Sequence, residues 1–520
     1  MYSGTFGRLF PVLAISLAGL LQACGGGGGG ESAPPPAPAI TDINGAATAS
    51  GTAGAGFIVD GSAFGTLSGT GVTAGYSVDF RDATNNTIVA TASYAGSGWT
   101  DAYIKAVVPG SGLTVGTTYK VSVTTPNGTS NGVNFTVTAS VALSPSTIAW
   151  GSTSALPAAI QGFPTVVAPI SVTSGTVTTT TNHIYTFGGN TAASGTLSGK
   201  NANIATVYSN TVNNGTGGTT AGTLAAASWT TETNALPAAR GFAAAALANG
   251  FNSRVSGSGT LYILGGLDAA GAATSTVYYA SLSSTGAVGA WSTTTALPQV
   301  RYAFGAAIFR GRLYVAGGND GTDTPAATVY SAPINGDGTL GAWSTSLPSL
   351  PAPVAYHQLV TTGGVLYVLG GTLSAALDPI SATQSAGTVG SVYYNSINPD
   401  GTLAGSSWST NPTSMIKAAE KHTIVAIGSY VLASGGLYSG AATGSSEESY
   451  ATQSTIDATL GSFQGATGSK TITGTPGGYN FFNHSAALYV DPAGNPHVLI
   501  LGGQTVGATP TVQTGVWYMK

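Results

Sequence analysis

The feature that most limits how this chain can fold is a strand-like motif that recurs six times. Each copy is a short apolar run ending in two adjacent glycines, and the copies occupy 184–189, 261–266, 313–318, 366–371, 431–436 and 498–503. Self-similarity at a period of roughly 50 residues or more is typical of propellers and other repeat architectures. The sequence therefore predicts one repeated body for most of the 520 residues.

The flanks of this motif repeat as well. A second strand with aromatic residues follows each glycine pair, as in Val277-Tyr278-Tyr279. A turn and a large aromatic residue come next, clearest at Asp337-Gly338, where glycine readily accepts a positive φ. The aromatic residue of this position is Trp229, Trp291, Trp343, Trp408 or Phe463, and Leu-Pro opens the next unit at 236–237, 297–298 and 350–351. Each unit is therefore predicted to be a small antiparallel sheet.

These units resemble kelch repeats over about 380 residues. The resemblance implies four-stranded blades with the tryptophan packed between neighbouring blades. The sixth unit stops after Val516-Trp517-Tyr518 without a tryptophan strand, and Trp150 followed by Leu156-Pro157 matches the missing piece. Closing the ring with that strand would remove both open sheet edges. We therefore expect residues 139–520 to form a six-bladed kelch-type β-propeller closed by an N-terminal strand.

Residues 40–138 precede this body and alternate apolar and polar residues with a period of two, which indicates half-buried strands. Their pattern resembles the IPT/TIG domain, an immunoglobulin-like fold, with matching motifs at 56–65, 76–80, 104–109, 119–123, 128–131 and 135–137. The resemblance implies a β-sandwich that serves as a spacer. The expected fold class of the whole chain is all-β.

The N-terminus carries signals for export. Arg8 precedes an apolar stretch at 9–20, which has signal-peptide length and is too short for a comfortable membrane span. Leu21-Gln22-Ala23-Cys24 resembles the lipobox of bacterial lipoproteins, and this implies cleavage before Cys24 and attachment of lipid to its thiol. We expect a signal peptide at 1–23, a Gly- and Pro-rich tether at 24–39 and a membrane partner through lipidated Cys24. Gly25 after the cysteine favours the outer membrane by the same resemblance; which side of it the body faces stays open.

Charge and cysteine content exclude several functions. Only 6% of residues are charged, the net charge is −4, and no basic cluster occurs, so a nucleic-acid partner is not expected. Cys24 is the single cysteine, which leaves no disulfide and no Cys-based metal or redox motif. Some copper radical oxidases share a kelch-type propeller, but their cofactor needs a Tyr–Cys link and is therefore excluded. No cofactor is expected.

Aligning the glycine pairs brings a few polar residues into one register. Phe304, His357 and His422 each lie thirteen residues before their pair, and His484 fits after a small insertion. Arg240 and Arg301 end Leu-Pro-x-x-Arg motifs nearby. In kelch-like propellers this segment is the innermost strand, so these side chains would point toward the channel or its mouth. They could bind an anionic or hydroxylated ligand there, or they could belong to the scaffold between blades, which the kelch pattern favours.

Catalysis and metal binding have little support in the sequence. His357, His422 and His484 could hold a metal in principle, but they lack the close spacing of a metal motif, and no metal site is expected. Residues 319–323 are acidic but are interpreted as a polar loop. Sialic-acid mutarotases are the nearest enzyme class, and Glu420 beside His422 is the only obvious acid–base pair for them. No catalytic residues are assigned.

These observations lead to one main expectation and two alternatives. The main expectation is a lipid-anchored envelope or cell-surface binding or adhesion protein whose propeller loops, such as 190–205 and 372–390, recognise a protein or glycan. The alternatives are a carbohydrate-active enzyme of the mutarotase kind and a purely structural envelope component.

Overall fold

The computed structural model describes residues 34–44, 48–68, 73–138, 150–174, 177–193, 197–215, 219–225, 229–249, 255, 258–398, 400–427, 430–438, 448–452, 459–465, 481–491, 495–506 and 509–519. The expected signal peptide and Cys24 lie outside these residues, as does most of the tether. Within them the secondary structure is β-strand with one short 3-10 helix, η1 (Leu197–Asn201), so the predicted all-β class is confirmed. No helix in the described part is long and apolar enough to cross a membrane.

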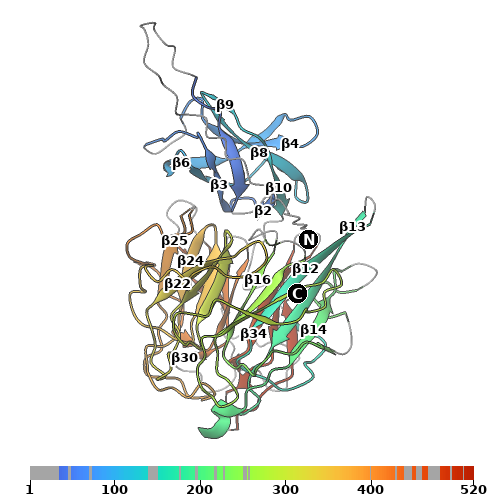
Figure 1. The fold of residues 1–520 in the computed structure, drawn as a ribbon, viewed down its shortest axis with the longest axis vertical. Helices are drawn as coiled ribbons and strands as arrows, with labels where there is room; N and C mark the ends of the chain where they lie inside the picture. The colour runs from blue at the N-terminus through green and yellow to red at the C-terminus, as the bar shows by residue number, and fades with distance from the viewer. Residues whose placement is uncertain are drawn as a thin grey trace, which may run out of the picture. The chain divides into compact units, whose positions relative to one another are not determined.

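The first ten strands form two sheets around one core (Figure 1). One sheet has the order β1 (Ala39–Ile43), β3 (Gly56–Ser62), β7 (Tyr103–Val107) and β6 (Ser93–Trp99). The other has the order β2 (Thr48–Thr52), β10 (Val133–Thr138), β8 (Thr118–Thr125), β4 (Ser77–Asp82) and β5 (Ile88–Thr91), with β9 (Gly128–Thr129) beside β8. The core takes Phe57 from one sheet and Phe80 and Phe135 from the other, and these three rings contact one another.

The remaining strands form a series of small antiparallel sheets. Each consists mainly of strands that are consecutive in the sequence, as expected when hairpin turns recur at short intervals. The sheets are β12 (Thr165–Ser174), β13 (Val177–Phe187), β14 (Val207–Val212), β15 (Thr230–Thr231); β16 (Ala244–Ala248), β17 (Thr260–Leu264), β18 (Val277–Ser281), β19 (Ser292–Thr294); β20 (Gly305–Phe309), β21 (Arg312–Ala316), β22 (Val329–Pro333); β23 (Gln358–Thr362), β24 (Val365–Leu369), β25 (Val392–Ser396), β26 (Ser409–Thr410); and β28 (Thr423–Ile427), β29 (Tyr430–Ser434), β31 (Glu448–Thr452), β32 (Gln464–Gly465). Two further sheets have two short strands each. β27 (Ala419–Glu420) pairs with β30 (Leu437–Tyr438), and β33 (Phe481–Phe482) pairs with β36 (Gln504–Thr505).

One further sheet joins the two ends of this region. It has the order β11 (Trp150–Ser152), β37 (Val516–Met519), β35 (Pro496–Leu501) and β34 (Ser485–Val490). Trp150 lies opposite Met519 and Gly151 opposite Tyr518 in an antiparallel register. The pairing of the Trp150 strand with the C-terminal strand, which the missing tryptophan strand predicted, is therefore present.

Each glycine pair follows the second strand of its sheet and ties that sheet to the next one. Both glycines of every pair have positive φ, which side chains other than glycine rarely adopt. The second glycine donates its N–H to a backbone carbonyl at the start of the following sheet. These bonds are Gly189 to Arg240, Gly266 to Arg301, Gly318 to Val354, Gly371 to Ala419, Gly436 to Phe481, and Gly503 back to Ile160. These six hydrogen bonds therefore link the sheets in a closed series, because the last sheet is bonded to the first.

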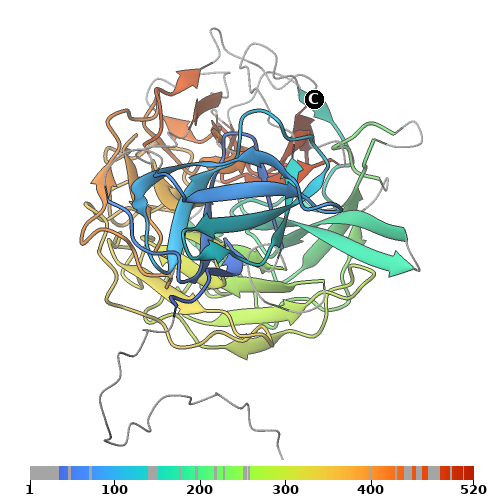
Figure 2. The same cartoon turned by 90° about the horizontal axis from the view of Figure 1, so that it is seen from above.

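A second closed set of backbone hydrogen bonds runs through six residues that we call the amide ring: Gly162, Phe242, Ala303, Tyr356, Lys421 and Asn483. The N–H of each residue donates to the carbonyl of the one before it, and Gly162 N donates to Asn483 O. All six have φ between 52° and 58°. The strands that follow them, β12, β16, β20, β23, β28 and β34, contact one another in the same circular order. In Figure 2 the ribbon colours accordingly follow one another around a centre, from green through yellow and orange to red.

Tryptophan side chains also join neighbouring sheets, through hydrogen bonds to backbone carbonyls. The indole N–H of Trp229, Trp291, Trp343 and Trp408 donates to the carbonyl of Ser154, Asn234, Thr295 and Pro348, respectively, at 2.9–3.1 Å. Every one of these acceptors lies two residues before a Leu-Pro pair, in the loop that leaves the preceding sheet. The recurrence of tryptophan and Leu-Pro in the sequence therefore reflects one repeated contact between sheets.

Candidate functional site

The two candidate arginines are buried and held by groups of their own sheets. Arg240 is 3% exposed; it donates to Tyr278 Oη at 3.0 Å and to the carbonyl of Ala239 at 2.7 Å. Its guanidinium lies over the Tyr278 ring, 4.9 Å from the centroid. Burial lowers the pKa of this group, and the adjacent tyrosine offsets part of the effect.

Arg301 occupies the equivalent place one sheet further on. It is 1% exposed and donates to Thr328 Oγ1 at 2.7 Å and to Gln299 Oε1 at 2.8 Å. Neither arginine lines the cavity described below. Phe242 and Ala303, each two residues after an arginine, have positive φ. The sequence left two roles open for both arginines, a ligand site at the channel mouth and the scaffold, and favoured the scaffold. The structure packs both guanidinium groups on tyrosine rings, that of Arg301 at 5.9 Å from the centroid of Tyr330.

Glu420 is also engaged internally. Its side chain is fully buried and accepts hydrogen bonds from the backbone N–H and hydroxyl of Ser385 and from the Thr388 hydroxyl. Ser385 and Thr388 belong to the loop between β24 and β25, so the carboxylate fastens that loop to β27. Glu420 does not line the cavity that contains His422.

The three histidines share one position, as the sequence alignment predicted. With Phe163, Ala243 and Phe304 they directly follow the amide-ring residues, and we call these six positions the inner register. A Cβ added to Gly317, Gly370 or Gly435 would lie 2.5–2.7 Å from Cε1 of His357, His422 or His484, respectively. Phe163 and Phe304 stand in the same way against Gly502 and Gly265. A flat ring in the inner register therefore fills the space that the first glycine of the preceding pair leaves open.

The imidazoles are buried and held neutral. The histidines are 1–6% exposed. Burial lowers the pKa of His357 to about 3, that of His422 to about 4 and that of His484 to about 3, and His422 adds to the effect on the other two. His484 Nε2 lies 2.8 Å from Thr423 Oγ1. The backbone carbonyls of Ala316 and Leu369 raise the pKa values of His357 and His422, respectively, and so offset part of the effect of burial. No hydrogen bond of good geometry reaches either ring nitrogen of these two residues.

Residues of the inner register and the amide ring line an open pocket of about 100 Å³, which we call the inner cavity. Three imidazoles line it on one side, together with Gln358, Lys421 and Asn483. Phe163, Phe242 and Phe304 line it on the other side. The structure thus brings His357, His422 and His484 together and leaves Arg240, Arg301 and Glu420 out.

Lys421 is a residue that the sequence reasoning did not select. It is 4% exposed, and its Nζ donates to the carbonyls of Asp378 and Ser381 at 3.1 and 2.9 Å. The ammonium also lies 5.2 Å from the ring centroid of Tyr356 and 5.7 Å from that of Phe482. Burial lowers its pKa to about 8. Its position between Glu420 and His422 was the one signal in the sequence.

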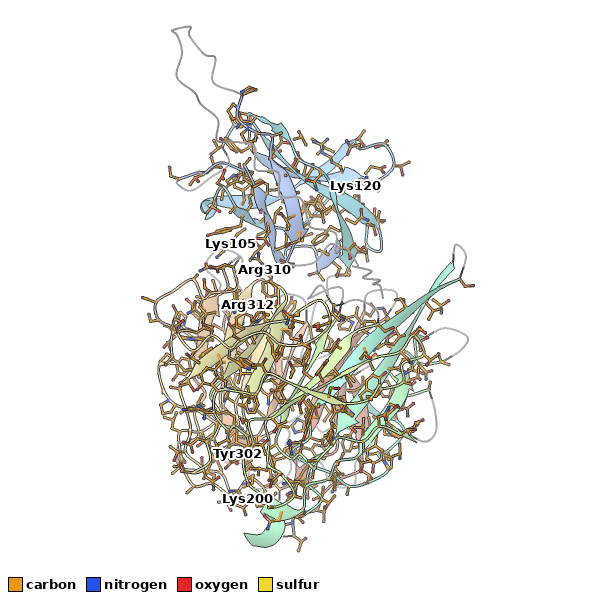
Figure 3. All side chains as sticks on the ribbon, viewed as in Figure 1. Lys105, Lys120, Lys200, Tyr302, Arg310 and Arg312 are labelled. Atoms are coloured by element: carbon orange, nitrogen blue, oxygen red, sulfur yellow. The ribbon has the colours of Figure 1, made fainter. Side chains whose placement is uncertain are left out.

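The loops that follow the glycine pairs are interlocked at one end of the sheets. We call the described residues of 190–205, 267–275, 319–327 and 372–390 the loop face. Lys200 forms an ion pair with Asp323 at 2.6 Å, and Figure 3 shows Lys200 beside Tyr302, whose hydroxyl also donates to Asp323. The carbonyl of Asp323 accepts the N–H of Ala376. Asn203 Nδ2 donates to Asp268 O at 2.7 Å. These bonds connect all four loops.

One of these loops also covers the amide ring. Ile380 is fully buried and packs with Phe242, Tyr302 and Tyr356. Pro379 O accepts a hydrogen bond from Asn483 Nδ2 at 2.8 Å. The segment 372–390, predicted to be a free recognition loop, is therefore partly committed to the interior, and its outer residues, such as Leu373 at 41% exposure, remain available.

No metal centre is formed by the described residues. No group of three or more His, Cys, Asp or Glu side chains there is arranged to hold a metal ion. The acidic residues of 319–323 are used within the fold, since Asp320 accepts hydrogen bonds from Thr322 and Thr324 and Asp323 binds Lys200 and Tyr302.

Comparison with known proteins gives no independent assignment. No protein-family model matches the chain, and no curated protein does either. The function must therefore be argued from the geometry of the loop face, the inner register and the inner cavity.

Proposed function

We propose that this chain is a lipid-anchored binding protein of the bacterial envelope that presents the loop face to a protein or glycan. In this proposal Cys24 carries the lipid, residues 24–39 are the tether, residues 40–138 are an IPT/TIG-like spacer and residues 139–520 are a six-bladed kelch-type propeller. The two closed sets of backbone hydrogen bonds and the pairing of β11 with β37 support the propeller.

One observation supports this function: the polar candidate residues form hydrogen bonds inside the fold, while the loops of the loop face are fixed to one another. The side chains of Arg240, Arg301 and Glu420 bind neighbouring groups of the scaffold. The loops of the loop face are fixed to one another by Lys200–Asp323 and by backbone bonds. A rigid set of loops on a scaffold is what recognition requires, because little conformational entropy is lost on binding.

Within the loop face, the chemistry of the segment 372–390 fits an uncharged partner surface. The segment 372–390 carries Ser, Thr and Ala side chains and one charged residue, Asp378, whose carbonyl binds Lys421. Hydroxyls and small apolar groups can recognise glycan hydroxyls or a neutral protein surface through hydrogen bonds and close packing. Long-range electrostatic attraction from this segment contributes little, and the charged residues of the loop face other than Asp378 lie in the other three loops, at Lys200, Asp268, Asp320 and Asp323.

The enzyme alternative loses its acid–base pair. Mutarotase-like chemistry needs an acid and a base that reach one substrate. Glu420 accepts three hydrogen bonds and lies outside the inner cavity, while His422 lines it. We therefore favour binding over catalysis.

Two matched variants of a soluble Cys24→Ala chain test the proposal. Leu373→Arg places a charge on the loop face, and Val172→Arg places one on β12 at a similarly exposed apolar position, 47% against 41%. Both should fold, and glycan arrays and pull-downs from envelope extracts should show loss of the partner with Leu373→Arg alone. The pair Arg301→Ala and His422→Ala should lower the melting temperature and keep partner binding. Binding lost in this pair at unchanged stability would contradict the proposal.

A further inference from the structure

One outer strand of the two sheets formed by β1–β10 has a free edge. β5 lies at the end of its sheet and, among the described strands, pairs with β4 alone. Ala92, directly after β5, donates its N–H to the carbonyl of Val78, so this bond points toward β4. Backbone groups alternate in direction along a strand, and the N–H and C=O of Thr91 therefore point away from β4. The register also skips Val89, which lies in a bulge without a partner in β4.

Other edges of the same two sheets are covered. The side-chain amide of Asn131 accepts the N–H of Ile40 at 2.8 Å and donates to the carbonyl of Ile40 at 2.9 Å, and so occupies the edge of β1. At the end of β6, the N–H of Leu67 donates to the carbonyl of Trp99. In the described part of the chain no comparable bond reaches the outer side of β5. Proteins usually avoid uncovered edges, because such edges invite pairing with a further strand.

The sequence of β5 lacks the usual protection as well. Its four residues include neither a charged residue nor proline, the residue types that most often block an edge. Ile88 is 54% exposed and Val89 is 39% exposed, although both are apolar. Thr91 Oγ1 donates to Asp79 Oδ1 at 2.9 Å, which holds the strand against β4. The edge is therefore apolar, fixed in place and able to pair.

A groove of about 510 Å³ lies along this edge. One wall is formed by 89–91 of β5 and the other by 107–112, with Gly54 and Ser93. None of these lining residues is charged. A Cβ added to Gly54 or Gly110 would meet no atom within 4 Å, so space is open beside both glycines. At about 3.3 Å per residue, the four residues of β5 offer roughly 13 Å of edge, enough for a strand of similar length.

We infer that β5 is a docking site for an extended, uncharged polypeptide segment of a partner protein. The segment adds a strand to the sheet: its backbone pairs with the free groups of Val89 and Thr91, and its alternate side chains lie in the groove. Small or β-branched apolar and hydroxyl side chains fit, because the walls consist of Gly, Ala, Val, Pro, Ser and Thr and offer no partner for a charge. In this mode main-chain hydrogen bonds supply affinity and the side-chain contacts supply selectivity.

The partner and the place of this site set it apart from the proposals above. A second copy of the chain is a less suitable occupant, since the bulge bends β5 and two bent strands would pair over very few residues. The site does not involve the loop face. It gives residues 40–138 a binding role in addition to the spacer role.

Peptide binding to the full chain carrying Cys24→Ala tests the inference. The probe is a labelled, end-capped pentapeptide of alternating Thr and Val; fluorescence anisotropy measures its affinity, and amide hydrogen exchange locates it. Saturable binding is expected, with slower exchange in 88–92 and unchanged exchange in β17. Two further peptides carry methyl groups on the backbone nitrogens of either the Thr or the Val residues. At least one of them should bind roughly ten-fold more weakly, because it cannot donate its hydrogen bonds to the edge.

Two matched variants locate the site. Val89→Lys places a charge on the free edge and should weaken binding of the unmethylated peptide roughly ten-fold. Val115→Lys changes an apolar residue of similar exposure, 50% against 39%, that does not line the groove, and should leave the affinity unchanged. If Val89→Lys does not fold, Gly110→Val replaces it, since its side chain enters the groove wall without a clash.

Several results would overturn the inference. Absence of saturable binding, slower exchange that spares 88–92, or equal affinity in Val89→Lys would place no peptide on β5. Equal affinity of both methylated peptides would show contact by side chains without an added strand. A dimer that forms with rising concentration and is lost in Val89→Lys would make a second copy the occupant. Partner binding by the loop face should persist in Val89→Lys and be lost in Leu373→Arg, so that failure of this site and failure of the proposed function can be told apart.

Discussion

Acid should unfold this protein through the three histidines of the inner register. Their pKa values in the folded state are about 3, 4 and 3, and an unfolded histidine titrates near 6.5. Between these values protons bind the unfolded chain and not the folded one. The stability is therefore complete above about pH 6.5 and is lost as the pH falls toward the folded-state values.

The size of the effect follows from the same values. One pKa unit corresponds to about 1.4 kcal/mol, so that at pH 5 each histidine lowers the free energy of unfolding by roughly 2 kcal/mol. His357, His422 and His484 together remove roughly 6 kcal/mol, which approaches the whole stability of an ordinary domain. Surface carboxylates such as Asp337 and Asp400 have lowered pKa values because of hydrogen bonds from Thr339 and Thr402, and they titrate only at lower pH. His183, whose pKa is also lowered by burial, adds to the loss, whereas Asp60, whose pKa is raised to about 7 by burial, offsets part of it as the pH falls.

Urea unfolding followed by tryptophan fluorescence at pH 7, 6 and 5 measures this loss. The triple variant His357→Phe, His422→Phe, His484→Phe should keep nearly all of its pH 7 stability at pH 5, and each single variant should recover roughly a third of the difference. His497→Gln is the control, since it removes a histidine outside the inner register. Equal stability of the natural chain at pH 7 and pH 5, or an equal acid loss in the triple variant, would refute the reasoning.

Three further predictions concern the anchor, the closing strand and the covering loop. Cys24→Ala should move the protein from membranes to the soluble fraction, and a variant that resists carbonate washing would contradict the lipid anchor. Trp150→Ala should lower the free energy of unfolding by roughly 3–5 kcal/mol in urea melts, because a buried ring is lost beside β37, while the more exposed Trp343→Ala should cost clearly less. Lys421→Met should speed amide hydrogen exchange in 372–390, because the hydrogen bonds from Lys421 to this loop are lost. The exchange rate should rise roughly ten-fold for each 1.4 kcal/mol of stabilisation lost, with β13 unchanged as reference. Exchange as slow as in the natural chain would show that Lys421 does not hold this loop.

The elements that the sequence predicted well are those that recur. Glycine pairs, aromatic strands, tryptophans and Leu-Pro each appear in several copies, so their spacing could be compared and a missing copy could be recognised. Trp150 was located in this way, and it lies opposite Met519 as expected. The contacts behind these signals are local to two neighbouring sheets, which is why the sequence records them at fixed offsets.

Features that occur once were missed for the complementary reason. Ile380 is buried under the loop face because the segment 372–390 is long enough to reach across the amide ring, whereas the equivalent segments 267–275 and 319–327 are shorter. The positive φ of the amide-ring residues recurs in all six units, but five of the six are not glycine, so no residue type marks it in the sequence. Non-glycine residues with positive φ are rare, so the sequence pattern gave no reason to expect one there.

The inner register separates what the repeat requires from what is particular to this chain. Packing against the first glycine of each pair requires a flat ring, and both phenylalanine and histidine meet that requirement, as Phe163 and His422 show at Gly502 and Gly370. A histidine in that place brings a polar group into the interior together with sensitivity to acid, and at His484 it adds a contact to the preceding sheet, with Nε2 2.8 Å from Thr423 Oγ1. The three imidazoles also interact with backbone carbonyls of the preceding sheet, at Ala316, Leu369 and Ser434, so the scaffold itself can use them as links between neighbouring sheets. The acid titration therefore tests the three histidines as parts of the scaffold.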